Sequence, residues 1–235
     1  MSRTPSRPVV VELLGLPGAG KSTLGDALAV ALPGLRRADG ATAPGVPVPI
    51  RLARKGFATA ATLARRPGLS TALLVALARS QGPGAALGRW VHWQQTQALL
   101  RRAAAPGGDP AAVRLLDEGA LQCLWSAGLR GDVGPLLARL DAAPGGWARG
   151  DVVVVLDVPV TVVAERLQGR SSRHSRTQLL APDARRAELE RGQALVEVLV
   201  AWCAAPGRPR VVRVDGTGTP QEAAVAVAAA LAAGS

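Results

Sequence analysis

The sequence has little of several residue types on which whole classes of protein depend. It contains no tyrosine and a single phenylalanine, and aromatic residues make up 3% of its 235 residues. Single-stranded nucleic acid is commonly held by stacking on aromatic rings, so this composition argues against such a binder. The two cysteines, Cys123 and Cys203, stand far apart without a C-x-x-C partner, so the sequence indicates neither a disulfide framework nor a zinc site. We expect both to be small buried side chains.

Lysine is also scarce, although the chain is strongly basic. The formal net charge is +11, yet Lys21 and Lys55 are the only lysines. Neither stands in the Asn-Lys-x-Asp motif with which GTPases read guanine, which argues against a GTPase. A basic balance without a binding motif is a weak signal for nucleic acid. We therefore expect the charge to serve anionic nucleotides and do not expect a nucleic-acid partner.

Long apolar runs are missing as well. Residues 1–8 contain no apolar stretch of the kind found in a signal peptide. The alanine-rich C-terminal stretch is better explained as a packed final helix than as a membrane span. We therefore expect a cytoplasmic protein without a membrane partner. At 235 residues and 48% hydrophobic composition, we expect one α/β domain over residues 1–235.

The most informative stretch is an apolar run at residues 9–14 that leads into a glycine-rich loop ending in Gly-Lys-Ser. The loop fits the P-loop pattern G-x-x-x-x-G-K-[ST] at every fixed position, and apolar residues at helical spacing follow it. Glycines allow phosphate oxygens to approach backbone N-H groups at a helix start. A structural glycine turn is the alternative. The predicted nucleotide-binding residues here are Gly15, Pro17, Gly18, Ala19, Gly20, Lys21, Ser22 and Thr23.

Within this loop, Lys21 is predicted to reach the β- and γ-phosphates of ATP, and the Ser22 hydroxyl to ligate Mg²⁺. Glu12 is the one charged residue of the preceding apolar run, and we expect an arginine partner for it.

A second acidic site follows the apolar strand predicted at residues 112–116. Asp117 and Glu118 come directly after this strand. A P-loop site needs a carboxylate at this place to anchor Mg²⁺ through water, which we assign to Asp117. Glu118 could accept the proton of an attacking hydroxyl. A structural role for Glu118 and a chance Asp-Glu pair remain the alternatives.

Residues 51–105 read as about three helices, with breaks at 66–68 and 82–84. An insertion at this point of a parallel sheet usually forms a wall of the substrate pocket. Its last helix carries aromatic and amide side chains at helical spacing, which suit a flat acceptor. The alternative is that the tryptophans are core and the glutamines a solvated face. The residues concerned are Trp90, Trp93, Gln94 and Gln97.

A basic segment at about residues 166–177 follows the strand predicted at 152–156 and its helix. Four arginines occur within residues 166–176. They repel one another unless an anion binds, which favours a phosphate-closing lid over a solvated basic loop. We assign Arg166 to the nucleotide, and Arg170 and Arg173 to the transferred phosphate. A long helix at 183–204, a strand at 210–214 and a final helix at 221–233 complete the prediction.

Together these pieces resemble the P-loop kinases of the thymidylate-kinase-like group, which contains nucleoside and nucleoside-monophosphate kinases. The resemblance rests on residues 15–23, 115–119, 156–159 with the arginine segment, and 214–216. It implies a three-layer sandwich with about five parallel strands between helices, and ATP with Mg²⁺ as donor. It also implies lid arginines over the phosphates and the loop of Asp215, Gly216 and Thr217 near adenine.

Two departures from the family bear on the acceptor. Thymidylate kinases carry Asp-Arg at the strand end, where this chain has Glu118, and residues 35–50 lack their acidic-proline motif. Both differences favour a hydroxyl acceptor, on a nucleoside, an antibiotic or another small metabolite, over a monophosphate. The oligomeric state stays open, with a homodimer as one option.

The sequence thus favours an ATP-dependent small-molecule kinase. Two other classes remain open. One is a P-loop ATPase or switch that acts on a protein or nucleic-acid partner, with Glu118 polarising water. The other is an ATP-binding scaffold without turnover.

Overall fold

The computed structural model describes residues 7–38, 48–105, 112–143, 147–169 and 176–233. Its centre is a parallel sheet of five strands in the order β2-β3-β1-β4-β5. The strands are β1 (Val9–Leu14), β2 (Arg36–Arg37), β3 (Val113–Leu116), β4 (Val152–Asp157) and β5 (Arg210–Asp215). The prediction of a sandwich with about five parallel strands is confirmed.

The two middle strands show why the sheet forms. Five of the six residues of both β1 and β4 are buried, as is typical of parallel strands that are covered on both faces. They pair in parallel with Val11 opposite Val152 and Leu14 opposite Val155. The apolar runs in the sequence therefore set the centre of the sheet.

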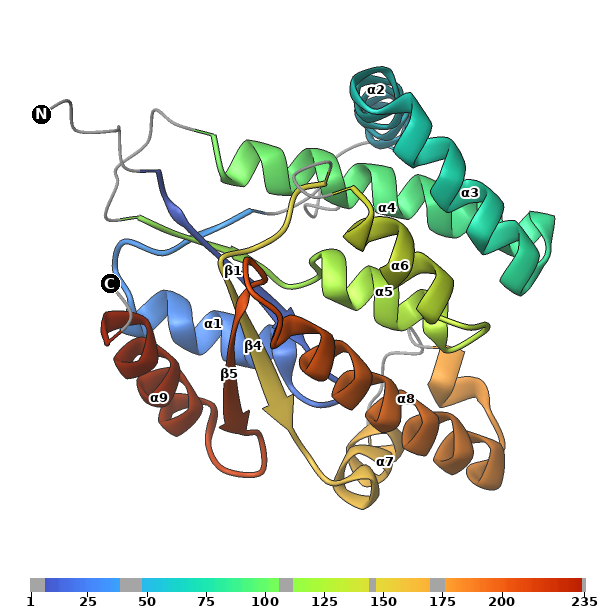
Figure 1. Ribbon diagram of the computed structural model, residues 1–235. Helices are drawn as coiled ribbons and strands as arrows, with labels where there is room; N and C mark the ends of the chain where they lie inside the picture. The colour runs from blue at the N-terminus through green and yellow to red at the C-terminus, as the bar shows by residue number, and fades with distance from the viewer. Residues whose placement is uncertain (1–6, 39–47, 106–111, 144–146, 170–175, 234–235) are drawn as a thin grey trace, which may run out of the picture.

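Helices cover both faces of the sheet (Figure 1). On one face α1 (Lys21–Ala31) packs against α9 (Pro220–Ala232). Thr219 caps α9 in a reciprocal capping box with Glu222. The other face carries α5 (Ala120–Gly128), α8 (Pro182–Cys203), α7 (Val160–Gln168) and α6 (Gly134–Asp141), with the short η1 (Arg176–Leu179) before α8.

The predicted helical insertion is present as three helices. They are α2 (Val48–Arg65), α3 (Pro67–Gln81) and α4 (Pro83–Ala103), with breaks where the Pro-Gly pairs fall. Helix α4 packs against α5, while α2 and α3 pack on the outer side of α4. The insertion therefore joins the rest of the molecule through α4, which packs on α5, and through α3, which packs on α6.

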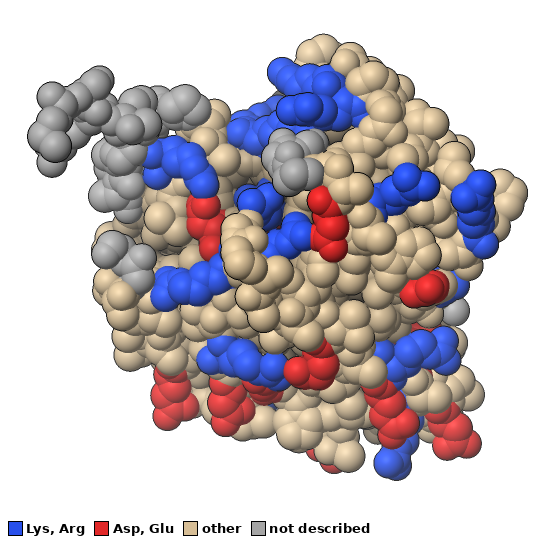
Figure 2. Space-filling model, viewed as in Figure 1, with Lys and Arg blue, Asp and Glu red and all other residues tan. Residues whose placement is uncertain are grey.

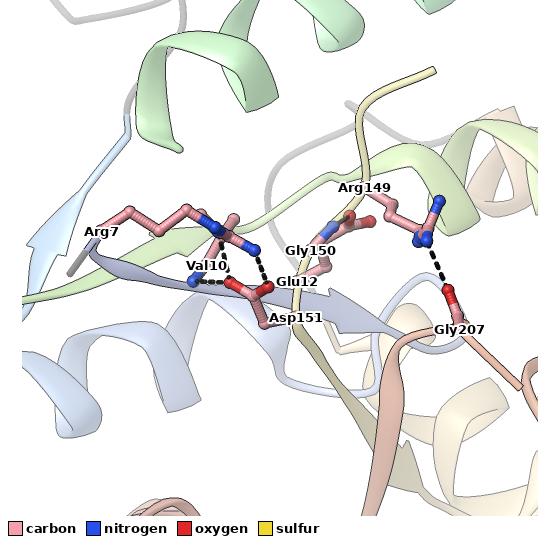
Figure 3. A network of polar contacts seen from close by, with 7 residues as sticks. All are labelled: Arg7, Val10, Glu12, Arg149, Gly150, Asp151 and Gly207. Atoms are coloured by element: carbon pink, nitrogen blue, oxygen red, sulfur yellow. Dashed lines mark hydrogen bonds and ion pairs between the residues drawn. The ribbon is translucent and has the colours of Figure 1, made fainter. Parts of the chain in front are cut away.

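Among the described residues, Glu12 does not have the arginine partner that we expected. Its side chain is 1% exposed, and its carboxylate accepts hydrogen bonds from the backbone N-H groups of Gly150 and Leu121 (3.3 Å for Leu121). Burial raises the pKa of Glu12 to about 7. A side chain at Gly119 would overlap this carboxylate, so the glycine allows α5 to start directly over β1. Glu12 thus holds the start of α5 to β1 through backbone amides (Figure 3 shows the Gly150 side).

Both cysteines are buried, as expected for small apolar side chains. Within the described ranges, no helix is long and apolar enough to cross a membrane.

Candidate functional site

The glycine-rich loop joins β1 to α1 in a left-handed backbone. Gly18 and Gly20 have φ of 86° and 104°, values that favour glycine. At Gly18 an added Cβ would lie 2.9 Å from Leu167, so α7 packs directly on the loop. Gly20 is the N-cap of α1, which has no side-chain cap and no acidic residue in its first turn. The first N-H groups of α1 are therefore suited to an anion.

Two cations lie on this loop. Lys21 Nζ donates to the carbonyl oxygens of Gly15 (2.7 Å) and Leu16 (3.1 Å). Arg166 of α7 donates from Nη1 to the carbonyl oxygen of Ala19 at 3.2 Å. The Lys21 ammonium and the Arg166 guanidinium thus stand at the two ends of the loop, where both can meet phosphate oxygens.

A cavity of about 720 Å³ opens from the loop at the carboxyl end of β1, which we call the loop cavity. One side is formed by Gly216, Gly218, Thr219, Pro220 and Ala223 at the start of α9. The opposite side is formed by Arg89, Glu118, Gln122, Trp125, Ser126, Leu129 and Arg130, from α4, α5 and the residues around α5. The predicted loop residues from Pro17 to Thr23, together with Arg166, line it between these sides. Its size is that of an ordinary small-molecule site.

Glu118 lines the loop cavity, as its predicted role requires. Its side chain is 63% exposed, and Oε2 lies 3.9 Å from Nε2 of His92 on α4. Arg89, one helical turn before His92, lines the same side. The carboxylate thus faces open space across the cavity from the loop, where a hydroxyl could approach it.

Asp117 faces a different direction. Its carboxylate is bonded to Arg37 of β2, which also bonds Asp26 of α1. An added Cβ at Gly25 would lie 3.1 Å from Asp117 Oδ1, so this carboxylate packs against α1 one turn after Ser22. Asp117 does not line the loop cavity. Its predicted link to a metal stays a prediction.

The loop after β5 is held by its own side chains. Asp215 Oδ1 accepts from the N-H (2.7 Å) and the hydroxyl (2.6 Å) of Thr217, which holds the pKa of Asp215 below its usual value. Of these three predicted residues only Gly216 lines the cavity. Arg170 and Arg173, the two arginines assigned to the transferred phosphate, lie outside the described residues.

The predicted acceptor platform on α4 lies in the core. Trp90 donates to the carbonyl oxygen of Ser70 (2.7 Å), and Gln97 exchanges hydrogen bonds with the backbone of Ala148. Trp93 packs against Trp147 with ring centroids 6.0 Å apart. Gln94 is fully buried. The structure thus agrees with the core alternative for the tryptophans and shows that both glutamines are buried rather than solvated. The backbone of Ala148 satisfies the Gln97 amide, whereas the buried Nε2 of Gln94 has no hydrogen-bond partner among the described residues.

Sequence reasoning missed several residues on the α4 and α5 side of the loop cavity. Arg89, Gln122 and Trp125 were not predicted as site residues. Gln122 Oε1 accepts from the N-H of Gly15 (3.3 Å), which ties α5 to the loop, and Trp125 donates to the carbonyl oxygen of Gly192 (2.7 Å). The available signal was position: the first turns of a helix that follows a strand end beside the loop face the same cavity.

The described residues offer no cluster of three or more His, Cys, Asp or Glu side chains for a metal. The Ser22 hydroxyl at the end of the glycine-rich loop suits Mg²⁺, which is usually held by one or two protein oxygens together with substrate phosphates.

Comparison with solved structures identifies the fold. A deoxyadenosine kinase from M. mycoides with bound dATP superposes with a TM-score of 0.56 at 12% identity, over 95% of this chain and 99% of that chain. The structure of that enzyme with bound dCTP gives 0.54 at the same identity and coverage. No protein-family model matches the sequence, and no curated protein matches it significantly. The fold that the resemblance implied is therefore confirmed.

Proposed function

We propose, from this shared fold and from the loop cavity, that the protein is an ATP-dependent phosphotransferase that moves the γ-phosphate to a hydroxyl of a small molecule. The observation that carries the proposal is a single cavity lined by both the phosphate-binding loop and Glu118. A kinase needs the donor phosphate and the acceptor hydroxyl together in one water-poor space. In this cavity the loop would hold the phosphate and Glu118 would meet the hydroxyl.

On the donor side, the loop N-H groups and Lys21 hold the β- and γ-phosphates, and the start of α9 with Gly216 lies against adenine. Arg166 meets phosphate oxygens from α7. Arg170 and Arg173 are proposed to act with it. Mg²⁺, held by Ser22 with Asp117 behind it through water, would neutralise charge on the phosphates.

On the acceptor side, Glu118 accepts the proton of the hydroxyl as its oxygen attacks the γ-phosphorus. The bond to the bridging oxygen of ADP breaks as the new phosphate ester forms. The Trp125 ring and the Gln122 amide offer a flat apolar surface and a polar group for the body of the acceptor. The M. mycoides structures contain dATP, dCTP or the products dCMP and dCDP, so nucleosides are the first acceptors to test.

The test is phosphate transfer from ATP with Mg²⁺ to a panel of nucleosides, nucleoside monophosphates and hydroxylated antibiotics, with products identified by mass. Lys21→Ala serves as the blank. A phosphorylated product that disappears in the blank supports the proposal and identifies the acceptor. ADP formed without any phosphorylated acceptor would favour an ATPase that acts on a partner. Tight ATP binding without any ADP would favour a scaffold.

A further inference from the structure

A second cavity, of about 610 Å³, lies at the opposite edge of the sheet from the phosphate-binding loop. Its lining comes from the residues just before β1, β4 and β5 and from the end of α4. We call it the amino-edge cavity and define it by Arg7, Arg101, Trp147, Arg149, Asp151 and Arg208. The loop follows the carboxyl end of β1, so the two cavities are separated by the length of the sheet.

The charge of the amino-edge cavity is strongly positive. Four of its lining residues are arginines, and Asp151 is the one carboxylate among them. Asp151 is already bonded to Arg7 and to the N-H of Val10 (2.9 Å each, Figure 3). Arg208 is paired with Asp141. Arg101 and Arg149 therefore have no carboxylate partner in the part of the chain that the structure describes.

Arg101 is the least compensated of the four. Its Nη1 is buried and has no hydrogen-bond partner among the described residues. Burial and the nearby charges of Arg65 and Arg66 lower its pKa. An arginine in this setting is unfavourable alone and becomes favourable when an anion is present.

Tryptophan rings contact two of the other three guanidinium groups, those of Arg149 and Arg208. Trp147 stacks between Trp93 and Trp202, with ring centroids 6.0 and 5.7 Å apart. Arg149 lies 5.4 Å over the Trp147 ring, and Arg208 lies 3.9 Å over the Trp202 ring. Such contacts fix a guanidinium without cancelling its charge.

The indole N-H of Trp147 is a second buried donor without an acceptor in the described part of the chain. Trp147 is 4% exposed, lines the cavity, and its Nε1 has no hydrogen-bond partner among the described residues. A buried N-H without an acceptor is rare in folded proteins. Arg101 and Trp147 both line this basic cavity, and each has a buried donor that an acceptor oxygen could satisfy.

We propose that the amino-edge cavity is a second ligand site, for a small polyanion with two or three linked phosphate groups. Guanidinium forks match phosphate oxygens two at a time, and the cavity holds several such forks with little acidic opposition. On the face shown in Figure 2, basic side chains are numerous in the upper and middle parts with a few acidic ones among them, and most acidic side chains lie toward the lower margin. A ligand bound here would lie at the opposite end of the strands from the loop cavity.

The test uses inorganic tripolyphosphate as the probe and the full chain carrying Lys21→Ala, which weakens binding at the loop. Calorimetry should show one tripolyphosphate bound per chain. Adding Arg101→Gln should weaken this binding at least tenfold. Adding Arg139→Gln, which changes an exposed arginine on α6, should change it less than twofold. No binding, or equal losses in the two variants, would overturn the proposal.

Thermal unfolding separates a ligand site from a structural arginine. Without the probe, Arg101→Gln should unfold at the same or a higher temperature than its parent, because it removes an unpaired charge. With the probe, the parent should gain several degrees and Arg101→Gln should gain almost nothing. A lower unfolding temperature without the probe would assign Arg101 to the fold and overturn the proposal.

Discussion

Two glutamates lie close to the start of α5 and differ in almost every physical respect. Glu118 is largely exposed and lines the loop cavity, whereas Glu12 is buried and bonded to backbone amides. An exposed carboxylate beside an open cavity can exchange protons with a substrate. A buried carboxylate that accepts backbone hydrogen bonds serves the fold instead. We therefore expect replacement of Glu118 to affect catalysis and replacement of Glu12 to affect stability.

Replacing Glu118 should remove transfer and spare ATP binding. Glu118→Gln keeps the shape and loses the proton acceptor, so we expect kcat to fall by about a hundredfold to ten thousandfold. The affinity for ATP should change less than about twofold, because the loop and Glu118 lie on different sides of the cavity. Kinetics and equilibrium ATP binding measure the two effects. Glu190→Gln, on the exposed face of α8, is the control, and unchanged turnover in Glu118→Gln would refute its role as base.

Glu12 should make stability depend on pH. Its pKa rises from 4.5 unfolded to about 7 folded because burial disfavours the charge. A raised pKa gives a contribution that is fully present below the unfolded value and is lost as the pH rises through the folded value. Relative to Glu12→Gln, the natural chain should therefore lose roughly 2 kcal/mol of unfolding free energy between about pH 5 and pH 8. Denaturant unfolding at both pH values measures this, and parallel changes in the two proteins would contradict it.

At the scale of helices and strands, the contact between α8 and α5 positions the acceptor side of the loop cavity. Gly192 of α8 lies against the Trp125 ring, where an added Cβ would stand 2.8 Å from Cζ2 and 2.9 Å from Leu16 Cδ2. The helix glycine is therefore a spacer that lets Trp125 reach the cavity wall.

Two helix glycines should respond oppositely to alanine. In general this change stabilises a helix by up to about 1 kcal/mol. Gly88→Ala on α4, where nothing lies within 4 Å of the new Cβ, should follow this rule. Gly192→Ala should instead destabilise by about 1 to 3 kcal/mol, because Trp125 and Leu16 must move. The unfolding free energies of the two variants test this prediction. Equal stabilisation would show that α8 can move away from Trp125 and Leu16 without a loss of stability.

Local sequence patterns predicted most helices and strands. They failed where contacts between distant parts of the chain determine whether a strand forms or where a side chain lies. The apolar runs of β1 and β4, the phosphate-binding loop and the Pro-Gly breaks around α3 need only neighbours in sequence. β2 has just two residues and only a weak pattern of its own, and it is held by pairing with β3. The face of α4 with Trp90 and Gln97 has the same spacing whether it lines a pocket or fills a core, and only the packing distinguishes these. The place of Arg89 opposite the loop depends on how α4 crosses α5.

At the scale of the whole molecule, the parallel sheet has two unlike ends. Its carboxyl edge carries the loop cavity, with Lys21, Arg166 and Glu118, and its amino edge carries an arginine-rich cavity that the fold alone does not require. Lys21 and three arginines line the loop cavity, and four arginines line the amino-edge cavity.

Binding of ATP should stabilise the whole chain. A ligand that binds only the folded state at a hundred times its Kd adds about 2.7 kcal/mol, which raises the unfolding temperature by several degrees. Thermal unfolding of the natural chain with ATP and Mg²⁺ should show this rise, and Lys21→Ala should show much less. Equal rises in both proteins would mean that ATP is held elsewhere.

The most direct test of the central claim follows the fate of the γ-phosphate. ATP labelled at the γ-position is mixed with the protein, Mg²⁺ and the nucleoside panel, and the label is divided between organic product and inorganic phosphate. The account predicts that most of the label enters a phosphorylated acceptor, and that Lys21→Ala transfers almost none. Label that appears only as inorganic phosphate, at a rate that no acceptor changes, would contradict the assignment as a kinase.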